Sequence, residues 1–162
     1  KDKGIDDYLK LSKNFNQQNV TFFLAGDLDT GNPNSLTQEE LEIIKAESSL
    51  NYLGYVDLQK ELHNYDLLLS LSDHEGFSRV LLEAMYVGLF VVAYDNNGTK
   101  YIDNFENTIL LNSKSQNNLK DNINNFLNEE KFISNENRKQ IEKSYSTKKV
   151  ASQFANIYNK KE

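Results

Sequence analysis

Two short and almost uninterrupted apolar runs constrain the fold of this chain more than any other feature. The first is DLLLSL at residues 66–71, and the second is GLFVVAY at residues 88–94. A strand with one face in water alternates apolar and polar residues, whereas a strand covered on both faces is apolar throughout. The two runs therefore predict buried strands of a parallel sheet that lies between layers of helices.

The rest of the chain alternates between helical and strand patterns. Apolar residues at three- and four-residue spacing, β-branched runs and turn residues predict strands at 20–25, 51–56 and 108–111 and helices at 5–15, 38–48, 57–64, 79–86, 115–130, 135–143 and 147–160. Thr37 and Glu40 fit a capping box at the start of the second helix. This alternation predicts an α/β fold, a Rossmann-like doubly wound parallel sheet of about five or six strands with helices on both faces.

Size and composition narrow the functional classes. A length of 162 residues, 38% of them hydrophobic, is enough for one domain with a sizeable core. The chain has no cysteine, which excludes disulfides, thiolate catalysis and cysteine metal sites. His63 and His74 are the only histidines, so we expect no bound metal ion.

The net charge and the hydropathy pattern limit the partners and the cellular location that we expect for this chain. The net charge of −6 argues against nucleic-acid binding, which needs a clustered basic surface. The apolar runs are far shorter than the roughly 20 residues that cross a bilayer, and no signal-peptide pattern is present, so we expect a cytoplasmic location. The chain starts with KDKG rather than methionine and goes straight into a helical pattern, which suggests that it was cut from a longer chain.

The segment SDHEGFSRVLLEAM at residues 72–85 carries the strongest chemical signal. It follows the first apolar run, and ligands of such sheets bind outside the carboxyl ends of the strands. Gly76 removes a side chain at the turn into the helix, so the backbone amides of Gly76, Phe77 and Ser78 can face a ligand. The N-terminus of a helix favours a phosphate or a diphosphate.

Two carboxylates belong to the same segment. With a helix that begins near Phe77, Glu83 lies about 9 Å along the axis, too far from Glu75 for the two to share a proton or a metal ion. They could bracket an elongated ligand, each accepting hydrogen bonds from the hydroxyls of a different sugar ring. From spacing alone, an ordinary strand-turn-helix with solvated carboxylates is the favoured interpretation.

The pattern E-G-F-x-x-x-x-L-E-A-M resembles the E-x7-E signature of glycosyltransferase family 4, the retaining enzymes of GT-B fold. Further segments resemble that family in its order, over residues 1 to about 112: KGIDDYLKL, FFLAGD, NYLGYV, YDLLLSLSDHEGF and GLFVVAYDNNGTKYI. The resemblance implies the C-terminal half of a GT-B fold. Residues 1–162 would form one nucleotide-sugar-binding domain with a helical tail at about 115–162, and the N-terminal acceptor-binding domain would lie outside this chain.

The resemblance also implies roles for single residues around the reacting sugar. Glu75 would contact hydroxyls of the donor sugar near the anomeric carbon, and Lys3 would neutralise the diphosphate leaving group; both would be catalytic. Gly76, Phe77 and Ser78 would contact the sugar and the diphosphate through their backbone amides. A family arginine and the strand before it would lie upstream of Lys1.

The nucleotide would be held by a second group of residues. Glu83 would bind the ribose hydroxyls, Tyr55 and Val56 would flank the base, and Gly26 would allow a close backbone approach. Arg79 could reach the diphosphate, and His74 could contact the sugar or the acceptor.

Ordinary structural roles fit several of these residues as well. Lys3 could be a terminal lysine, Tyr55 a rim aromatic, Arg79 a surface arginine and His74 a loop histidine. Tyr101 stands where many family members carry a glutamate, so the role of that glutamate does not transfer.

By this resemblance the donor would be a UDP-linked sugar, used without a metal or other cofactor. The acceptor would be a glycan or a lipid-linked sugar of bacterial capsule, O-antigen or oligosaccharide synthesis, bound by the missing domain. The intact enzyme, a hexosyl- or N-acetylhexosaminyltransferase, could associate peripherally with the cell membrane, and the fragment alone would be inactive.

Three alternatives to this interpretation remain. Asp27-Leu28-Asp29 imitates the D-x-D motif that holds a divalent ion in the other glycosyltransferase fold, although turn chemistry also explains aspartates there. A sugar-nucleotide epimerase of the same fold would need no acceptor. The third alternative is a nucleotide-binding module with no activity of its own.

Overall fold

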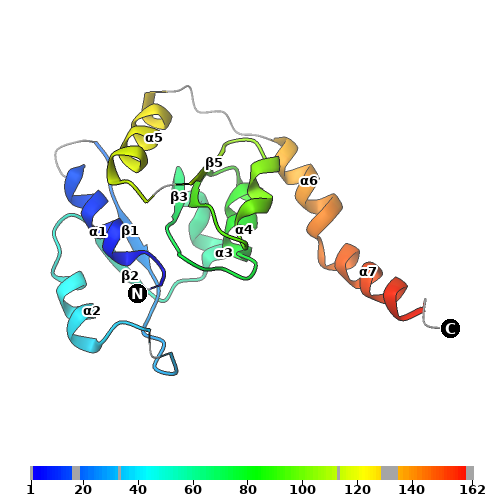
Figure 1. Cartoon of the computed structure of the whole chain (residues 1–162), viewed down its shortest axis with the longest axis horizontal. Coiled ribbons are helices and arrows are strands. Elements are labelled where there is room, and N and C mark those ends of the chain that lie inside the picture. The colour runs from blue at the N-terminus through cyan, green and yellow to red at the C-terminus, as the bar shows by residue number, and fades with distance from the viewer. Residues whose placement is uncertain (1, 16–18, 33, 113, 129–134, 160–162) are drawn as a thin grey trace.

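The predicted order of strands and helices is confirmed by a computed structural model, which describes residues 2–15, 19–32, 34–112, 114–128 and 135–159 (Figure 1). The strands are β1 Phe23–Ala25, β2 Asn51–Gly54, β3 Leu67–Ser70, β4 Phe90–Tyr94 and β5 Thr108–Leu111. The helices are α1 Ile5–Asn14, α2 Gln38–Lys45, α3 Leu58–Glu61, α4 Arg79–Val87, α5 Gln116–Asn128, α6 Asn135–Tyr145 and α7 Thr147–Asn159, with short 3₁₀ helices η1 Leu62–Asn64 and η2 Lys100–Asn104.

All pairings between the described strands are parallel, as the sequence predicts, but they fall into two sheets. One sheet has the order β1-β2 and the other has the order β3-β4-β5. In the larger sheet Leu69 lies opposite Val92, and Val92 lies opposite Ile109. The expected single sheet is divided because β1 and β3 do not pair with each other.

Strand β4 separates two hydrophobic cores. Val92 and Tyr94 belong to a core that includes residues of α1 and α5, such as Leu11 and Ile123. Val91 and Ala93 belong to a second core, built with residues of α4 and α6. Helices therefore cover both faces of the larger sheet, which confirms the α/β class.

The other apolar run, in β3, is less buried than its sequence predicts. All four residues of β3 are only half-buried, whereas Val91 to Tyr94 of β4 are buried. The reason is the position of the strand, since β3 has a neighbour on one side only. The run is still covered on both faces, since Leu67 and Leu69 pack against the first core and Leu68 against the second, but less completely than its sequence predicts.

The helix ends follow local sequence signals. The predicted capping box is present at α2, where the Glu40 amide donates to Thr37 Oγ1 at 3.1 Å and the Thr37 amide donates to Glu40 Oε2 at 2.8 Å. Helix α4 ends at Val87 and is followed by the C-cap Gly88, which has a φ of 92° that side-chain-bearing residues rarely adopt.

The C-terminal tail is helical, as expected, and α7 extends away from the rest of the molecule (Figure 1). The predicted ends at residues 130 and 160 lie outside the described residues. None of the helices described is both long and apolar enough to cross a membrane.

Candidate functional site

An ion pair joins the two residues that the sequence analysis predicts to be catalytic. Lys3 Nζ lies 2.7 Å from Glu75 Oε1, although 72 positions separate the residues in the sequence. The Glu75 side chain is 18% exposed and the Lys3 side chain 64% exposed. The structure therefore places a carboxylate and an ammonium group together beside the carboxyl end of β3.

The position of Lys3 is fixed by the glycine that follows it. Gly4 has a φ of +70°, and a Cβ atom there would lie 2.0 Å from the carbonyl oxygen of Leu71. Only glycine allows this close approach to the end of β3. The Asp73 amide also donates to the Asp2 carbonyl at 2.9 Å, so the residues on both sides of Lys3 are held against the same loop.

A second glycine brings the turn after β4 against Glu75. A Cβ atom on Gly98 would lie 2.2 Å from the carbonyl oxygen of Glu75. Asn96 Nδ2 donates to the Ser72 carbonyl at 3.1 Å, and the buried Thr99 hydroxyl donates to the Tyr94 carbonyl at 2.7 Å. This turn therefore links the carboxyl ends of β3 and β4 and supports the backbone of Glu75 from behind.

The N-terminus of α4 begins next to Glu75. Ser78 occupies the N-cap position without a side-chain cap, is buried, and directs its amide to the Gly98 carbonyl at 3.5 Å. Gly76 is exposed, and a Cβ atom there would meet nothing within 4 Å. Internal packing does not require a glycine at position 76, which is the situation expected where a ligand approaches the backbone.

An aromatic cluster, which sequence reasoning missed, surrounds the side chain of Phe77. The Phe77 ring stacks on Tyr101 at a centroid distance of 4.8 Å and on Tyr145 at 5.9 Å, while remaining 50% exposed. The Tyr101 hydroxyl donates to the Ser78 carbonyl at 2.5 Å. Tyr101 and Tyr145 lie far along the chain from the turn, so no local pattern announces the cluster.

Burial raises the pKa of the Tyr101 hydroxyl, and the nearby Tyr145 and Glu75 raise it further. Tyr101 is therefore a neutral hydrogen-bond donor at physiological pH. Its bond to the Ser78 carbonyl holds the first turn of α4 in place.

The other candidates on this segment have no partner among the residues that the structure describes. Glu83 is half-buried on α4, and His74 and Arg79 are exposed. Within the described part of the chain, none of the three side chains makes a hydrogen bond or an ion pair. The Glu83 carboxylate is available to hydroxyl donors from outside the protein.

The residues expected near the base lie at the ends of β1 and β2. Gly26 has a φ of +141°, its amide donates to the Gly54 carbonyl at 2.8 Å, and the Tyr52 hydroxyl donates to its carbonyl at 2.7 Å. Tyr55 is 86% exposed and Val56 is half-buried. Gly26 is needed here for its backbone conformation, since a Cβ atom would meet nothing within 4 Å.

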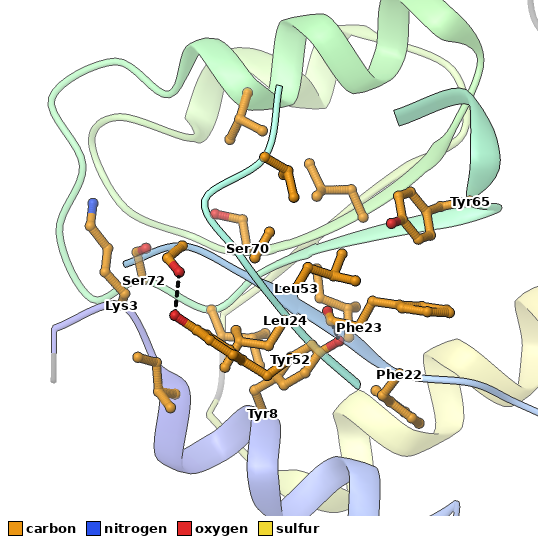
Figure 2. A pocket seen from close by; sticks show the side chains of 18 of the residues that line it. Lys3, Tyr8, Phe22, Phe23, Leu24, Tyr52, Leu53, Tyr65, Ser70 and Ser72 are labelled. Carbon is orange, nitrogen blue, oxygen red and sulfur yellow. Dashed lines mark hydrogen bonds between the residues drawn. The ribbon is translucent and has the colours of Figure 1, made fainter. Parts of the chain in front are cut away.

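A cavity of about 970 Å³ brings part of the candidate set together (Figure 2). Its lining includes Lys3, Gly26, Val56, His74 and Glu75. The remaining predicted site residues, which are Tyr55, Gly76, Phe77, Ser78, Arg79 and Glu83, lie outside this lining. The cavity therefore extends from the ion pair to the ends of β1 and β2, where the base is expected, but its lining does not include Glu83 or the start of α4.

The D-x-D sequence serves a turn. Asp27 Oδ1 accepts from the Leu28 amide at 2.7 Å, and Asp29 Oδ1 accepts from the Gly31 amide at 3.2 Å. No group of three or more histidine or acidic side chains suited to a metal ion occurs among the residues that the structure describes. The bonds made by Asp27 and Asp29 are those of turn-forming aspartates.

Comparison with protein families gives one clear match. The family model of glycosyl transferases group 1 matches residues 1–147, which is most of the chain. No curated protein matches the chain significantly.

Solved structures share the fold at low sequence identity. HepE from Anabaena, solved in complex with UDP and glucose, has a TM-score of 0.81 and 20% identity, and the match covers 98% of this chain and 45% of HepE. TarM has a TM-score of 0.77 and 25% identity, and the match covers 98% of this chain and 33% of TarM. WaaG, a glycosyltransferase involved in lipopolysaccharide biosynthesis, has a TM-score of 0.70 and 21% identity. The match covers 96% of this chain and 43% of WaaG. The chain thus spans less than half the length of each.

Proposed function

The chain belongs to the group 1 glycosyl transferases, and on this premise we propose that it is the donor-binding domain of a retaining glycosyltransferase. The observation that carries the proposal is the ion pair of Lys3 with Glu75 beside the N-terminus of α4. A cation, a carboxylate and the N-terminus of a helix are what a nucleoside diphosphate sugar requires at its diphosphate and its sugar ring.

Lys3 and Glu75 would act on different parts of the donor. The bond between the anomeric carbon and the diphosphate oxygen breaks, and the Lys3 ammonium stabilises the negative charge that develops on the leaving diphosphate. The acceptor oxygen forms the new bond on the same face of the sugar, and its proton passes to the departing diphosphate. Glu75 accepts hydrogen bonds from sugar hydroxyls and holds the ring in place.

The nucleotide would extend from the diphosphate toward Glu83 and Tyr55. Glu83 has no partner among the described residues, as a carboxylate that receives two ribose hydroxyls should. Tyr55 is largely exposed at the end of β2, where a base could lie against it. We propose uridine as the base, because the HepE structure contains UDP, and a use in surface glycan synthesis by analogy with WaaG.

Calorimetry with UDP tests the role of Lys3. The variant Lys3→Met keeps the length of the side chain but removes the charge, so the Kd for UDP should rise about tenfold, which is the usual cost of one charge-assisted hydrogen bond. Lys60→Met is the matched control, since Lys60 also pairs with a carboxylate, that of Asp57 at 3.0 Å, on the exposed helix α3. Equal affinity of both variants would contradict the assignment.

The same titration tests the ribose site independently. Glu83→Gln should weaken the binding of UDP, because the variant loses the carboxylate that accepts hydrogen bonds from the ribose hydroxyls. The affinity for inorganic diphosphate should be unchanged, because diphosphate has no ribose to contact this side chain. Glu39→Gln, at an exposed position in the first turn of α2, is the control. A Glu83→Gln variant that binds UDP as the unmodified chain does would overturn the ribose assignment.

A further inference from the structure

The side chain of Phe77 holds an aromatic ring at the surface, just before the start of α4. The ring is 50% exposed, and Phe77 lies only two residues after Glu75 in the chain. The residues around it in the sequence are small or polar, namely Gly76, Ser78 and Arg79. Packing of the core therefore does not account for the half of the ring that faces solvent.

One face of the Phe77 ring is covered and the other is open. Tyr101 and Tyr145 stack on Phe77 at centroid distances of 4.8 and 5.9 Å, with interplanar angles of 27° and 26°. If the two tyrosines lay against opposite faces of the ring, the distance between their own centroids would be close to the sum of these two distances. That distance is 6.0 Å, so both tyrosines lie on the same side of Phe77, and its exposed half includes the opposite face.

The ring is held in this orientation by elements that are distant in the sequence. Tyr101 belongs to η2 and Tyr145 is the last residue of α6, and both pack against the second hydrophobic core. Tyr145 also contacts Phe105 at a centroid distance of 6.1 Å, and the Tyr101 hydroxyl donates to the Ser78 carbonyl at 2.5 Å. The open face is therefore in place before a ligand arrives, which lowers the entropic cost of binding.

The open face lies beside the site proposed for the transferred sugar without belonging to it. The Glu75 carboxylate is directed to Lys3 and lines the cavity, whereas the Phe77 ring is directed to η2 and α6 and lies outside the lining. Burial raises the pKa of the Tyr101 hydroxyl, and Tyr145 and Glu75 raise it further, so the aromatic cluster is within electrostatic reach of the carboxylate. A sugar held by Glu75 thus leaves the face of Phe77 free for a second ring.

A pyranose ring fits this face. The face of an aromatic ring carries partial negative charge, and one face of a pyranose presents C–H groups that are weakly positive. The sugar hydroxyls point outward from the rim, where Arg79 is exposed and has no partner among the described residues. A stable contact with a protein would need about 800 Å² on each partner, far more than one ring offers.

Resting on the function proposed above, we propose that Phe77 is the stacking platform for a pyranose ring of the acceptor, bound next to the sugar that Glu75 holds. The acceptor is then a glycan or a lipid-linked sugar, since a hydroxyl group of a protein side chain or of a simple lipid offers no ring to stack. Phe77 takes no part in bond formation and keeps the acceptor sugar beside the reacting carbon.

Saturation-transfer nuclear magnetic resonance tests the platform with three probes, the methyl glycosides of glucose, galactose and N-acetylglucosamine, in the presence of UDP. Irradiation of the aromatic protons of the protein should transfer saturation to the C–H protons of at least one glycoside. Phe77→Leu keeps an apolar side chain but removes the ring, so the transfer should fall about fivefold. Phe154→Leu is the matched control, because Phe154 is a 56% exposed ring on α7, and it should leave the transfer unchanged.

The absence of transfer to all three glycosides, or an equal loss in Phe77→Leu and Phe154→Leu, would overturn the proposal. A transfer that Glu75→Gln removes and Phe77→Leu retains would place the glycoside in the donor-sugar site and would also overturn it. If Phe77→Leu does not fold, Phe77→Trp provides the second measurement. Its larger ring should increase the transfer, and an unchanged or weaker transfer would contradict the platform.

Failure of this proposal is distinguishable from failure of the proposed function. The titrations of Lys3→Met and Glu83→Gln use UDP or diphosphate and no glycoside, so they test the donor site alone. If UDP binding depends on Lys3 and Glu83 while the transfer does not depend on Phe77, the donor site stands and the platform is wrong.

Discussion

Strands β3 and β4 lie side by side and have equally apolar sequences, yet they differ in burial. Val91, Val92 and Ala93 are fully buried, whereas no residue of β3 is. Strand β4 has a neighbour on each side, and β3 has one neighbour and faces the cavity on its other side. An apolar run therefore indicates the burial that a strand requires, while the actual burial depends on the strands that flank it.

The largest effect should come from a charge placed at one of two directly opposed positions. Leu69 of β3 lies opposite Val92 of β4. Val92→Asp buries an unpaired carboxylate and should cost about 4 kcal/mol or more, enough to unfold the chain. Leu69→Asp can direct its carboxylate into the cavity and should leave a folded protein. Urea unfolding followed by circular dichroism measures the free energy of unfolding of both variants. An equal loss of stability in the two would contradict the difference between the strands.

A smaller effect is expected at the carboxyl end of β3. This end packs closely against Gly4, whereas the unpaired edge of the strand borders the cavity. Gly4→Ala would place a Cβ atom against the Leu71 carbonyl at a strained φ and should cost about 2 to 4 kcal/mol. Gly76→Ala is the control, because a Cβ atom there meets nothing. Thermal unfolding followed by calorimetry compares them, and a Gly4→Ala protein as stable as Gly76→Ala would contradict the close approach.

The smallest effect concerns the Tyr8 side chain, which donates a hydrogen bond to the edge of β1. Tyr8→Phe removes the hydrogen bond to the Phe23 carbonyl and should cost about 1 kcal/mol at neutral pH. Burial raises the pKa of Tyr8 above the ordinary value, so above about pH 10 the unfolded state loses this proton first and stability falls as the pH rises. The variant should show a shallower alkaline decline in urea unfolding; an unchanged slope would exclude this contribution of Tyr8.

Much of the fold could be predicted because its signals are local. The apolar runs, the Thr37 and Glu40 capping box and the start of α4 all depend on residues close together in the sequence. The division into two sheets could not be predicted, because a local pattern identifies a strand but does not say which other strand it pairs with. Strand β1 also begins at Phe23 rather than at Val20.

The candidate site was less accessible to sequence reasoning. The E-G-F segment marked the turn, and the proximity of Lys3 and Glu75 was implied by family resemblance alone. The stacking of Phe77 with Tyr101 and Tyr145, and the support that Gly98 gives to Glu75, depend on the tertiary fold. No spacing rule connects such distant residues, so these contacts could be found only in the structure.

The most direct test of the donor-site assignment is a nuclear magnetic resonance titration of the chain with UDP, observing backbone amides. The account predicts the largest shifts at Gly76 and Phe77, which are exposed at the start of α4 where the diphosphate is expected, and little change at Leu67 and Leu69 at the other end of the cavity. Shifts confined to Leu67 and Leu69, or the absence of any shift at millimolar UDP, would contradict it.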